Sequence, residues 1–364
     1  MWNFLTLEPE AFGLEISASS LKIVKLKRKK RGFSLASFGE QKVQQGMIEN
    51  GEVKDEQLLV EAIKEGLKKV KGERIKTRYV VCSLPEEKSF LQIIQMPKIE
   101  EAELKKAVLY EAENYVPLPI EEVYIDSQII PPVYNHLDHF DVLLVAFPKK
   151  IVDSYVACLK KAGLQPKVLE LESLATARVL IKNEVVPYSL LIIDLGTLRT
   201  SIIIYSGYSL RFTTSISISY SGLVEAVRKE FAVSFNKAEK LLLKYGLVSK
   251  KAEGKRVSKS LIPVLVDLVK QVKKYVDYYY SHAFHEHLPP NERGIKKIIL
   301  CGRGAELKGV KDFLFGELEI PVELGNPWIN ILSSLSEKPP LTYSESLKYT
   351  TALGLALRGV REKK

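Results

Sequence analysis

The first group of residues that could do chemistry lies near the start of the chain. Glu15 ends an apolar, strand-like run and is followed by the small residues Ser17, Ala18 and Ser19 and then by Lys22. Tight turns of small residues expose backbone N–H groups, which bind anions, and a lysine adds a point charge that suits a phosphate. This segment therefore predicts a turn that contacts the phosphates of a nucleotide.

A second segment, in the other half of the chain, repeats this plan. Asp194 ends an apolar run, and a small-residue turn with Gly196, Thr197 and Thr200 follows it. A hairpin repeated at matching places in two halves predicts two related lobes that face each other. Glu15 and Asp194 would then lie on opposite sides of one cleft, where their carboxylate oxygens suit a hydrated Mg²⁺ ion.

A third turn contains two glycines, Gly302 and Gly304, with Arg303 between them. It follows a strand-like run and precedes a helical pattern expected over 306–314. Glycines at such a place let a flat base or a ribose approach the backbone closely. Taken singly, each of these turns has a plainer reading as an ordinary β-turn at a strand end. The order and separation of all three favour a nucleotide cleft.

The overall composition limits the class of protein. The 364 residues are 46% hydrophobic and 27% charged, which permits large cores, and 54 basic against 44 acidic residues give a net charge of +10. No apolar stretch reaches the roughly 18 residues that a membrane span needs, and residues 1–8 lack the pattern of a secretory signal. Three separated cysteines argue against a disulfide framework and a structural zinc site, so a reducing cytosol is the simplest compartment.

Two further clusters have both a plain and a functional interpretation. Lys25–Arg31 carries six positive charges around an expected hairpin tip, which are either solvated loop charges or a contact with anionic lipid. Nucleic acid is disfavoured there, because no aromatic residues alternate with the cations. His282, His285 and His287 could be metal ligands, but cations that cap a helix C-terminus are far more common.

Apolar runs and helical spacing alternate along the whole chain, which favours an α/β fold with mixed sheets. Strands are expected over 12–16, 21–27, 33–39, 79–84, 90–96, 142–147, 168–171, 190–195, 201–205, 210–216 and 297–301. Helices are expected over 56–69, 100–115, 149–162, 173–182, 223–231, 236–245, 261–285 and 346–357. Loop-like residues at 183–187 and 338–342 predict boundaries between larger units.

The three turns resemble the phosphate and adenosine segments of the actin-like superfamily, which includes actin, sugar kinases and the cell-division protein FtsA. Within it, three other stretches resemble the PilM family of type IV pilus assembly proteins. These are the block from Met96-Pro97 to Pro117-Leu118-Pro119, the segment Asn326-Pro327-Trp328 and the helix Ala352–Gly359. The resemblance covers about residues 12–360, and the first block is much more specific than the turns.

The resemblance implies a two-lobe, actin-like (ribonuclease H-like) fold that binds ATP or ADP with Mg²⁺. Lobe I would span 1–186, with a subdomain of the FtsA and PilM type inserted at about 86–165. Lobe II would span 187–340, with a helical subdomain at about 222–290, and residues 341–364 would form a C-terminal helix that returns to lobe I.

The resemblance also implies a cytoplasmic scaffold peripheral to the inner membrane. In PilM relatives, lobe I receives the cytoplasmic N-terminal tail of PilN, a bitopic inner-membrane protein. Other pilus platform proteins and self-association are further possible contacts of such a scaffold. Contact with the membrane would be indirect, through this partner, or direct, through Lys25–Arg31.

Several residues depart from the superfamily pattern and predict weak chemistry. Ser17 stands where glycine is usual, and its Cβ would crowd the phosphates. Glu239 resembles the acid that meets the ribose, but Leu242 replaces the lysine expected in that helix, and a serine precedes Gly222 in place of a second glycine. We therefore expect nucleotide binding with, at most, very slow ATP hydrolysis. The alternative is an active ATPase or a sugar kinase of the same superfamily.

Overall fold

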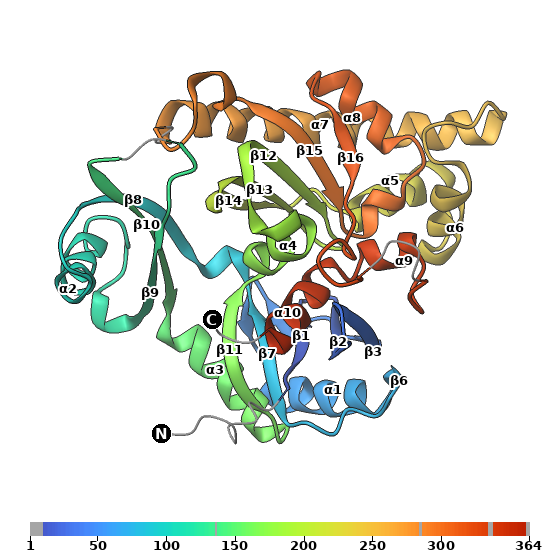
Figure 1. Cartoon of the computed structure of the whole chain (residues 1–364). Coiled ribbons are helices and arrows are strands. Elements are labelled where there is room, and N and C mark those ends of the chain that lie inside the picture. Colours follow the sequence, from blue (N-terminus) through green and yellow to red (C-terminus); the bar gives the residue numbers. More distant parts are fainter. Residues whose placement is uncertain (1–9, 135–136, 284–285, 334–337, 362–364) are drawn as a thin grey trace.

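The computed structural model describes residues 10–134, 137–283, 286–333 and 338–361. Within these ranges the strands form a six-stranded, a five-stranded and a three-stranded sheet and the short hairpin β4–β5 (Ile48–Glu49 and Glu52–Val53). In Figure 1 the five-stranded unit lies above the six-stranded unit, and the small sheet lies to their left. We call the six-stranded unit lobe I, the five-stranded unit lobe II, and the three-stranded sheet with helix α2 (Glu101–Ala112) the insert.

The sheet of lobe I contains all the strands expected in this part of the chain. Its order is β11 (Gln165–Leu171), β7 (Tyr79–Leu84), β1 (Phe12–Ile16), β2 (Ser20–Arg28), β3 (Phe33–Lys42) and β6 (Lys71–Gly72). Strands β1, β2 and β3 form an antiparallel meander, and β7 pairs with β1 in parallel. Helices α1 (Glu56–Lys68) and α3 (Lys149–Lys161) cover one face, where Leu14, Leu59 and Tyr155 share one core.

The other face of this sheet is covered by α10 (Thr350–Val360), on which α4 (Glu172–Leu180) packs in turn. Close packing here requires small residues. A Cβ on Gly13 of β1 would lie 2.5 Å from Ala356 N, and a Cβ on Gly354 would lie 1.9 Å from the Ala175 carbonyl oxygen. The C-terminal helix is therefore held directly beneath the strand that leads to the first candidate turn.

The single helix expected over 346–357 is two helices, α9 (Tyr343–Leu347) and α10. The first helix begins with a capping box between Thr342 and Glu345. Tyr349 then leaves the helical backbone region, with φ −102° and ψ 11°, and its ring packs edge-on against Phe38 of lobe I. This tertiary contact accompanies a break that the helical spacing does not indicate.

The sheet of lobe II has the order β14 (Ser209–Ile216), β13 (Thr200–Gly207), β12 (Val186–Leu195), β15 (Ile295–Cys301) and β16 (Val322–Leu324). Three helices, α5 (Tyr220–Phe231), α6 (Phe235–Tyr245) and α7 (Ala252–His282), form a helical part beside it. Helix α7 starts nine residues before the expected 261 and continues through Pro263, because buried residues such as Val257 and Leu265 lie at helical spacing on both sides of the exposed proline.

Short 3₁₀ turns connect several elements: η2 (Glu86–Lys88), η3 (Ile120–Glu122), η4 (Lys182–Glu184), η5 (Pro290–Glu292) and η6 (Arg303–Glu306). The helix expected over 306–314 is wrong in position. The chain forms η6 first and then α8 (Val310–Leu318), because Gly309 adopts a φ of +86° between them.

The insert contains β8 (Phe90–Pro97), β10 (His139–Pro148) and β9 (Val123–Ile130), with β10 in the middle. Leu104 and Val108 of α2 pack on one face of this sheet. Strand β9 is not among the expected apolar runs because its residues 126–128 are polar and exposed. Helix α3, which the expected insert of 86–165 includes, buries its apolar side in the core of lobe I instead.

Candidate functional site

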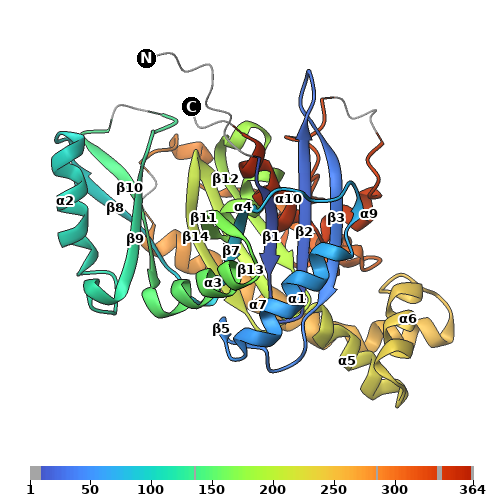
Figure 2. The same ribbon diagram turned by 90° about the horizontal axis from the view of Figure 1, so that it is seen from below.

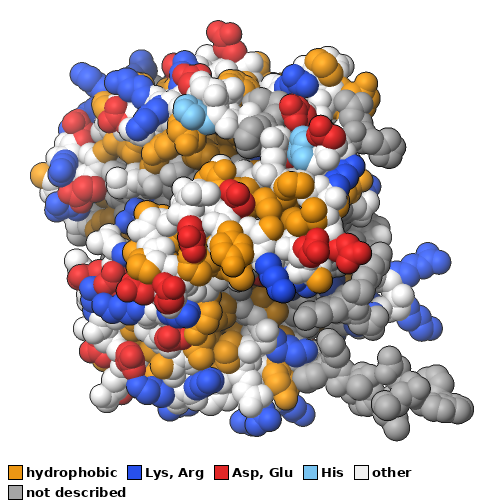
Figure 3. Space-filling model, turned by 90° about the vertical axis from the view of Figure 1, so that its left-hand side faces the viewer, with side chains coloured by type: hydrophobic (Ala, Val, Ile, Leu, Met, Phe, Trp, Pro, Cys, Tyr) orange, Lys and Arg blue, Asp and Glu red, His pale blue; other side chains and the backbone are white. Residues whose placement is uncertain are grey.

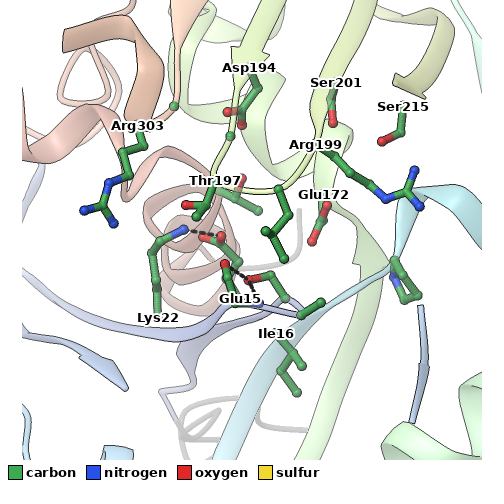
Figure 4. Close-up of a pocket in the computed structure, with 18 of the residues that line it drawn as sticks. Glu15, Ile16, Lys22, Glu172, Asp194, Thr197, Arg199, Ser201, Ser215 and Arg303 are labelled. Atoms are coloured by element: carbon green, nitrogen blue, oxygen red, sulfur yellow. Dashed lines mark hydrogen bonds and ion pairs between the residues drawn. The ribbon is translucent and has the colours of Figure 1, made fainter. Parts of the chain in front are cut away.

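A cavity of about 330 Å³ lies between the lobes and is lined by the turns that follow β1 and β12. Most of the residues expected at a nucleotide site line it: Glu15, Ser17, Ala18, Ser19, Lys22, Asp194, Gly196, Thr197, Gly302 and Arg303. Figure 4 shows the labelled members of this set around one opening, with Arg303 on one side and Arg199 on the other. The two turns that the sequence pairs therefore face the same space.

The turn of lobe I, after β1, is hydrogen-bonded largely to itself. The Ser17 N–H and the Ser17 hydroxyl both donate to the Ser20 carbonyl, at 3.1 and 2.9 Å. The same hydroxyl oxygen accepts from the backbone N–H groups of Ser19 and Ser20, at 3.4 and 3.2 Å. Ser17 therefore occupies N–H groups that a glycine would leave available to an anion.

Glu15 and Lys22 are direct partners in the register of β1 and β2. The Lys22 ammonium donates to Glu15 Oε1 (Figure 4), and Glu15 is only 7% exposed. Burial alone would lower the pKa of Lys22, but Glu15, together with Glu40 and Asp194, outweighs burial and the net pKa is raised. The lysine therefore stays charged at neutral pH. The other carboxylate oxygen, Glu15 Oε2, is buried and has no hydrogen-bond partner among the described residues.

The turn of lobe II, after β12, is more open. The backbone N–H groups of Thr197, Leu198 and Arg199 make no hydrogen bond to any residue in the described ranges. Gly196 precedes them in a tight conformation, since a Cβ there would lie 2.7 Å from the Arg199 carbonyl oxygen. Successive unpaired N–H groups in a turn form an anion-binding concavity. This turn therefore offers a phosphate more donors than the turn of lobe I.

Asp194 is the last but one residue of β12, beside this turn, and lines the cavity (Figure 4). The pKa of Asp194 is raised from the ordinary value of 3.8 to about 6; burial is the main cause, the Glu15 carboxylate also raises the pKa, and Lys22 and a hydrogen bond with Cys301 oppose both effects. Gly302 lies directly against this carboxylate. A Cβ on Gly302 would lie 2.2 Å from Asp194 Oδ1, and its φ of +83° also favours glycine.

Four other expected site residues do not line the cavity: Thr200, Gly222, Glu239 and Gly304. The Thr200 hydroxyl donates to the Ile218 carbonyl at 2.7 Å and so joins the start of β13 to the segment that follows β14. The Gly222 N–H donates to the hydroxyl of Ser219, the N-cap of α5, at 3.2 Å. Gly304 packs on Leu195, because a Cβ there would lie 2.3 Å from that side chain. These residues shape the walls behind the cavity.

Glu239 makes its contacts with neighbouring side chains of lobe II. Its carboxylate accepts from Arg303 at 2.8 Å and from the Tyr220 hydroxyl at 2.9 Å, and the Arg303 guanidinium lies 5.0 Å from the centre of the Tyr220 ring. Leu242, one turn further along α6, is fully buried in the lobe II core. Arg303, which lines the cavity, is therefore held in place by Glu239 and Tyr220 behind it, and Leu242 makes no polar contribution.

Sequence reasoning missed several polar residues at the far end of the cavity, namely Glu172, Ser201 and Ser215. Asp194, Ser201 and Ser215 are neighbours in register across β12, β13 and β14, so they form one row along the sheet edge. In the sequence, the only sign of this row is that the apolar runs of β12, β13 and β14 each have a polar residue at this end. Glu172, the first residue of α4, is a carboxyl whose pKa is raised well above the ordinary value by burial and by the nearby Glu15 carboxylate.

The sequence also did not predict a role for Arg199, which connects the lobes across this end of the cavity. Its guanidinium lies 3.2 Å from Asn50 Oδ1 in the β4–β5 hairpin and 3.5 Å from Glu87 in η2. Both partners belong to the lobe I half of the chain, whereas Arg199 follows β12 of lobe II. The bridge therefore joins the open phosphate-type turn to the opposite lobe.

The donor set of the cavity suits a hard cation only in part. Glu15 Oε2 is a buried oxygen without a partner in the described part of the chain, and Asp194 supplies a second carboxylate, so the residues present fit a Mg²⁺ ion that keeps most of its waters. Among the described residues no group of three or more His, Cys, Asp or Glu could hold a metal.

The histidine cluster has structural contacts instead. His282 stacks on Tyr278 with ring centres 4.3 Å apart, and buried His287 is hydrogen-bonded to the Ser206 hydroxyl at 2.9 Å. His285 lies outside the described residues. In the part of the chain that the structure describes, no helix is long and apolar enough to cross a membrane.

The fold and the paired turns define a protein of the actin-like class. Two solved actin-like structures show the same fold over nearly the whole chain. The ethanolamine utilization protein EutJ from Carboxydothermus hydrogenoformans has a TM-score of 0.55 at 13% identity, covering 96% of this chain and 89% of that one. MreB5 of Spiroplasma citri bound to AMPPNP has a TM-score of 0.50 at 13% identity, covering 95% of both chains. The expected two-lobe fold is confirmed.

The family follows from a closer match. The model of the type IV pilus assembly protein PilM family matches residues 13–360, and the chain belongs to this family. A solved PilM-PilN type IV pilus biogenesis complex has a TM-score of 0.78 at 27% identity, covering 97% of this chain and 99% of that one. The resemblance inferred from the Met96–Pro119 block and the C-terminal helix is therefore confirmed.

Proposed function

We propose that this chain is a nucleotide-binding scaffold of a type IV pilus assembly platform, which docks the cytoplasmic tail of a PilN-like membrane protein. The observation that carries the proposal is the family match over 13–360, together with the likeness to a PilM chain solved with PilN. In this proposal the chain works at the cytoplasmic face of the inner membrane. Residues 1–186 form lobe I, 187–340 form lobe II and 341–364 return to lobe I.

The nucleotide is ATP or ADP, and the cavity between the lobes is its site. The open N–H groups of residues 197–199, together with Lys22 and the Ser17–Ser19 turn, contact the phosphates. Gly302 and Arg303 face the nucleoside, while Thr200, Gly222, Glu239 and Gly304 support the walls. The actin-like protein MreB5 has been solved with AMPPNP, and a fold shared with it supports a nucleotide in this position.

Mg²⁺ accompanies the nucleotide and would be held by Glu15 and Asp194, in part through water. When bound, the ion would neutralise phosphate charge. Lys22 donates to one oxygen of Glu15, the second oxygen is buried with no partner among the residues that the structure describes, and Asp194 lies on the lobe II side of the same cavity. The Glu15 carboxylate adds to the effect of burial in raising the pKa of Asp194, so the two carboxylates repel each other, and a cation would relieve that repulsion.

The role is that of a scaffold with, at most, very slow turnover, and an active ATPase or sugar kinase is the alternative. The Ser17 hydroxyl occupies N–H groups of the first turn, and Leu242 offers the nucleoside no polar contact. Calorimetry with Mg-ATP and Mg-ADP tests this function, with Asp194→Ala as the matched variant. If neither nucleotide binds at millimolar concentration, the cavity is not a nucleotide site. Turnover above about 1 s⁻¹ would favour an active ATPase or sugar kinase over a scaffold.

The partner tail is expected on lobe I, between its main sheet and the insert. An extended tail can add backbone hydrogen bonds and place one or two apolar side chains in pockets. Hydrogen exchange with a synthetic peptide of the PilN-like tail tests this placement, and we expect protection in β8 and β10. Protection confined to 223–283 of lobe II would contradict it.

Fractionation of cells with and without the partner gene tests the location, since loss of the partner should release the protein from the membrane.

A further inference from the structure

The β2–β3 hairpin extends beyond the body of lobe I (Figure 2). Its tip turns at residues 29–32, where the Lys29 N–H donates to the Gly32 carbonyl at 3.1 Å and Gly32 has a φ of +69°. Every residue from 27 to 32 is exposed. The tip therefore presents its side chains to whatever lies beyond this end of the molecule.

The six cations of Lys25–Arg31 gather toward the tip of the hairpin. Lys25 lies 3.5 Å from Glu10, and Lys27 pairs with Glu73, which follows β6. Beyond them, Arg28, Lys29, Lys30 and Arg31 are consecutive in sequence and exposed at the turn. The positive charge of the hairpin is thus concentrated at its outermost end.

Contacts with distant parts of the chain hold this tip in place. The Arg28 guanidinium donates to the Val360 carbonyl at the end of α10, at 3.1 Å, and lies 6.0 Å from the centre of the Phe33 ring. The Phe33 N–H donates to the Ile331 carbonyl at 2.7 Å. A Cβ on Gly32 would lie 2.9 Å from the same carbonyl oxygen. The cations are therefore displayed on a supported projection.

We propose that the β2–β3 tip is a docking surface for an anionic phospholipid bilayer. Four adjacent cations on a projecting turn can approach a flat surface of phosphate groups together, and each cation raises the partition coefficient roughly fivefold. Residues 28–32 contain no apolar side chain that could insert, so the contact is electrostatic and salt-sensitive. The neighbouring ring, Phe33, is half-buried beside Arg28, so the tip lacks the stacking platform that single-stranded nucleic acid requires.

This contact goes beyond the proposed function, because it needs neither the nucleotide nor the partner tail. Electrostatic binding through one small basic cluster is reversible, and stable attachment generally takes two signals. A scaffold that is bound to the partner tail and also carries a basic tip would have two signals. The contact of the tip with the bilayer would orient the scaffold on the membrane. The test uses purified protein without the partner, so its failure leaves the proposed function intact.

The experiment is co-sedimentation with phosphatidylcholine vesicles that contain or lack phosphatidylglycerol, at low and at molar ionic strength. The wild-type chain is expected to bind only the anionic vesicles, and only at low salt. The triple variant Lys29→Glu, Lys30→Glu and Arg31→Glu is expected to lose at least tenfold in partitioning. A matched variant, Lys250→Glu, Lys251→Glu and Lys255→Glu, makes the same change of net charge at exposed positions of lobe II and should keep its binding.

Three outcomes would overturn the proposal. Equal loss in both triple variants would mean that the overall charge of +10, and not the tip, attracts the vesicles. Retention of binding within twofold in the tip variant would place the contact elsewhere. Thermal unfolding of all three proteins controls for folding, since the substituted lysines and arginine are exposed. Binding of the tip to single-stranded DNA in preference to anionic vesicles would likewise reject a bilayer as its partner.

Discussion

The turn of lobe I and the turn of lobe II occupy matching places in a duplicated plan, yet their polar groups differ in how far they are paired within the protein. In lobe I, Glu15 is paired with Lys22, and the Ser17 hydroxyl takes up the N–H groups of the turn. In lobe II, Asp194 has a pKa raised to about 6, and the N–H groups of residues 197–199 have no partner within the described ranges.

The difference teaches that the backbone N–H groups of the lobe I turn are used without a ligand, whereas those of residues 197–199 have no partner in the described ranges. Unpaired N–H groups and a destabilised carboxylate gain most when an anion and its cation arrive, because an unmade hydrogen bond at a partly buried group is costly. Two turns of similar sequence can therefore contribute unequally to one site. Substitutions at the lobe II turn should therefore change nucleotide affinity more than substitutions at the lobe I turn.

The largest effect is expected from Asp194→Ala. This change removes the carboxylate beside the open turn, and with it the group that Mg²⁺ would relieve from repulsion by Glu15. We expect Mg-ATP affinity to fall by about 100-fold or more, in line with the 3 kcal/mol typical of a lost charge-assisted contact. Calorimetry with and without Mg²⁺ measures it. The control is Glu15→Ala, whose smaller loss would support the unequal roles, whereas a larger loss would reverse them.

A second effect comes from pH. Because the pKa of Asp194 is raised to about 6 in the folded chain, protonation below pH 6 should weaken Mg-ATP binding about tenfold per pH unit. The stability of the ligand-free protein should change with pH in the opposite direction. The folded state binds this proton more tightly than the unfolded state, so the ligand-free protein should lose stability as pH rises from about 4 through 6. Asp194→Asn should flatten both profiles in this window, and unchanged profiles in that variant would assign the titration to another group.

A smaller effect, with the opposite sign, is expected from Ser17→Gly. The change frees the N–H groups of Ser19 and Ser20 from the serine hydroxyl and removes a Cβ from the cavity wall. We expect Mg-ADP and Mg-ATP to bind a few-fold more tightly, at a loss of about 1 kcal/mol in stability from the flexible glycine. Calorimetry and thermal unfolding measure the two effects. Ser17→Ala separates them, because it frees the N–H groups but keeps the Cβ; equal affinity in all three proteins would mean that the lobe I turn does not limit binding.

Much of the fold could be predicted because its signals are local. The apolar runs at β1, β12 and β15 end at the carboxylate or small residues that begin each turn, so the apolar pattern and the turn residues mark the same boundaries. The errors arose where tertiary packing outweighs local preference. The stripe of buried residues carries α7 through Pro263, the ring of Tyr349 accompanies the break between α9 and α10, and β9 forms although its centre is polar.

The site could be predicted only as far as its backbone turns. Glu15, Lys22, Asp194 and Gly302 lie at strand ends, so their spacing already places them near a common edge. Glu172 and Arg199 enter the cavity from a helix start and from within a turn, and only the meeting of the lobes makes them neighbours of the others. The pairing of Glu239 with Arg303 is likewise a contact across 64 residues, which no local pattern contains.

The smallest effect is expected from Glu172→Gln, and it tests whether the far end of the cavity takes part in nucleotide binding at all. Burial and the neighbouring carboxylates hold the pKa of Glu172 well above the ordinary value, so glutamine closely imitates the protonated side chain. We expect Mg-ADP affinity to change by less than about threefold, because the turns that hold the phosphates are untouched. The midpoint of thermal unfolding should rise slightly at pH 8, where the wild-type carboxyl is closest to ionising, and stay unchanged at pH 5. A large loss of affinity would mean that an ionised Glu172 contacts the ligand, and would extend the asymmetry between the two turns to a third, lobe I carboxylate.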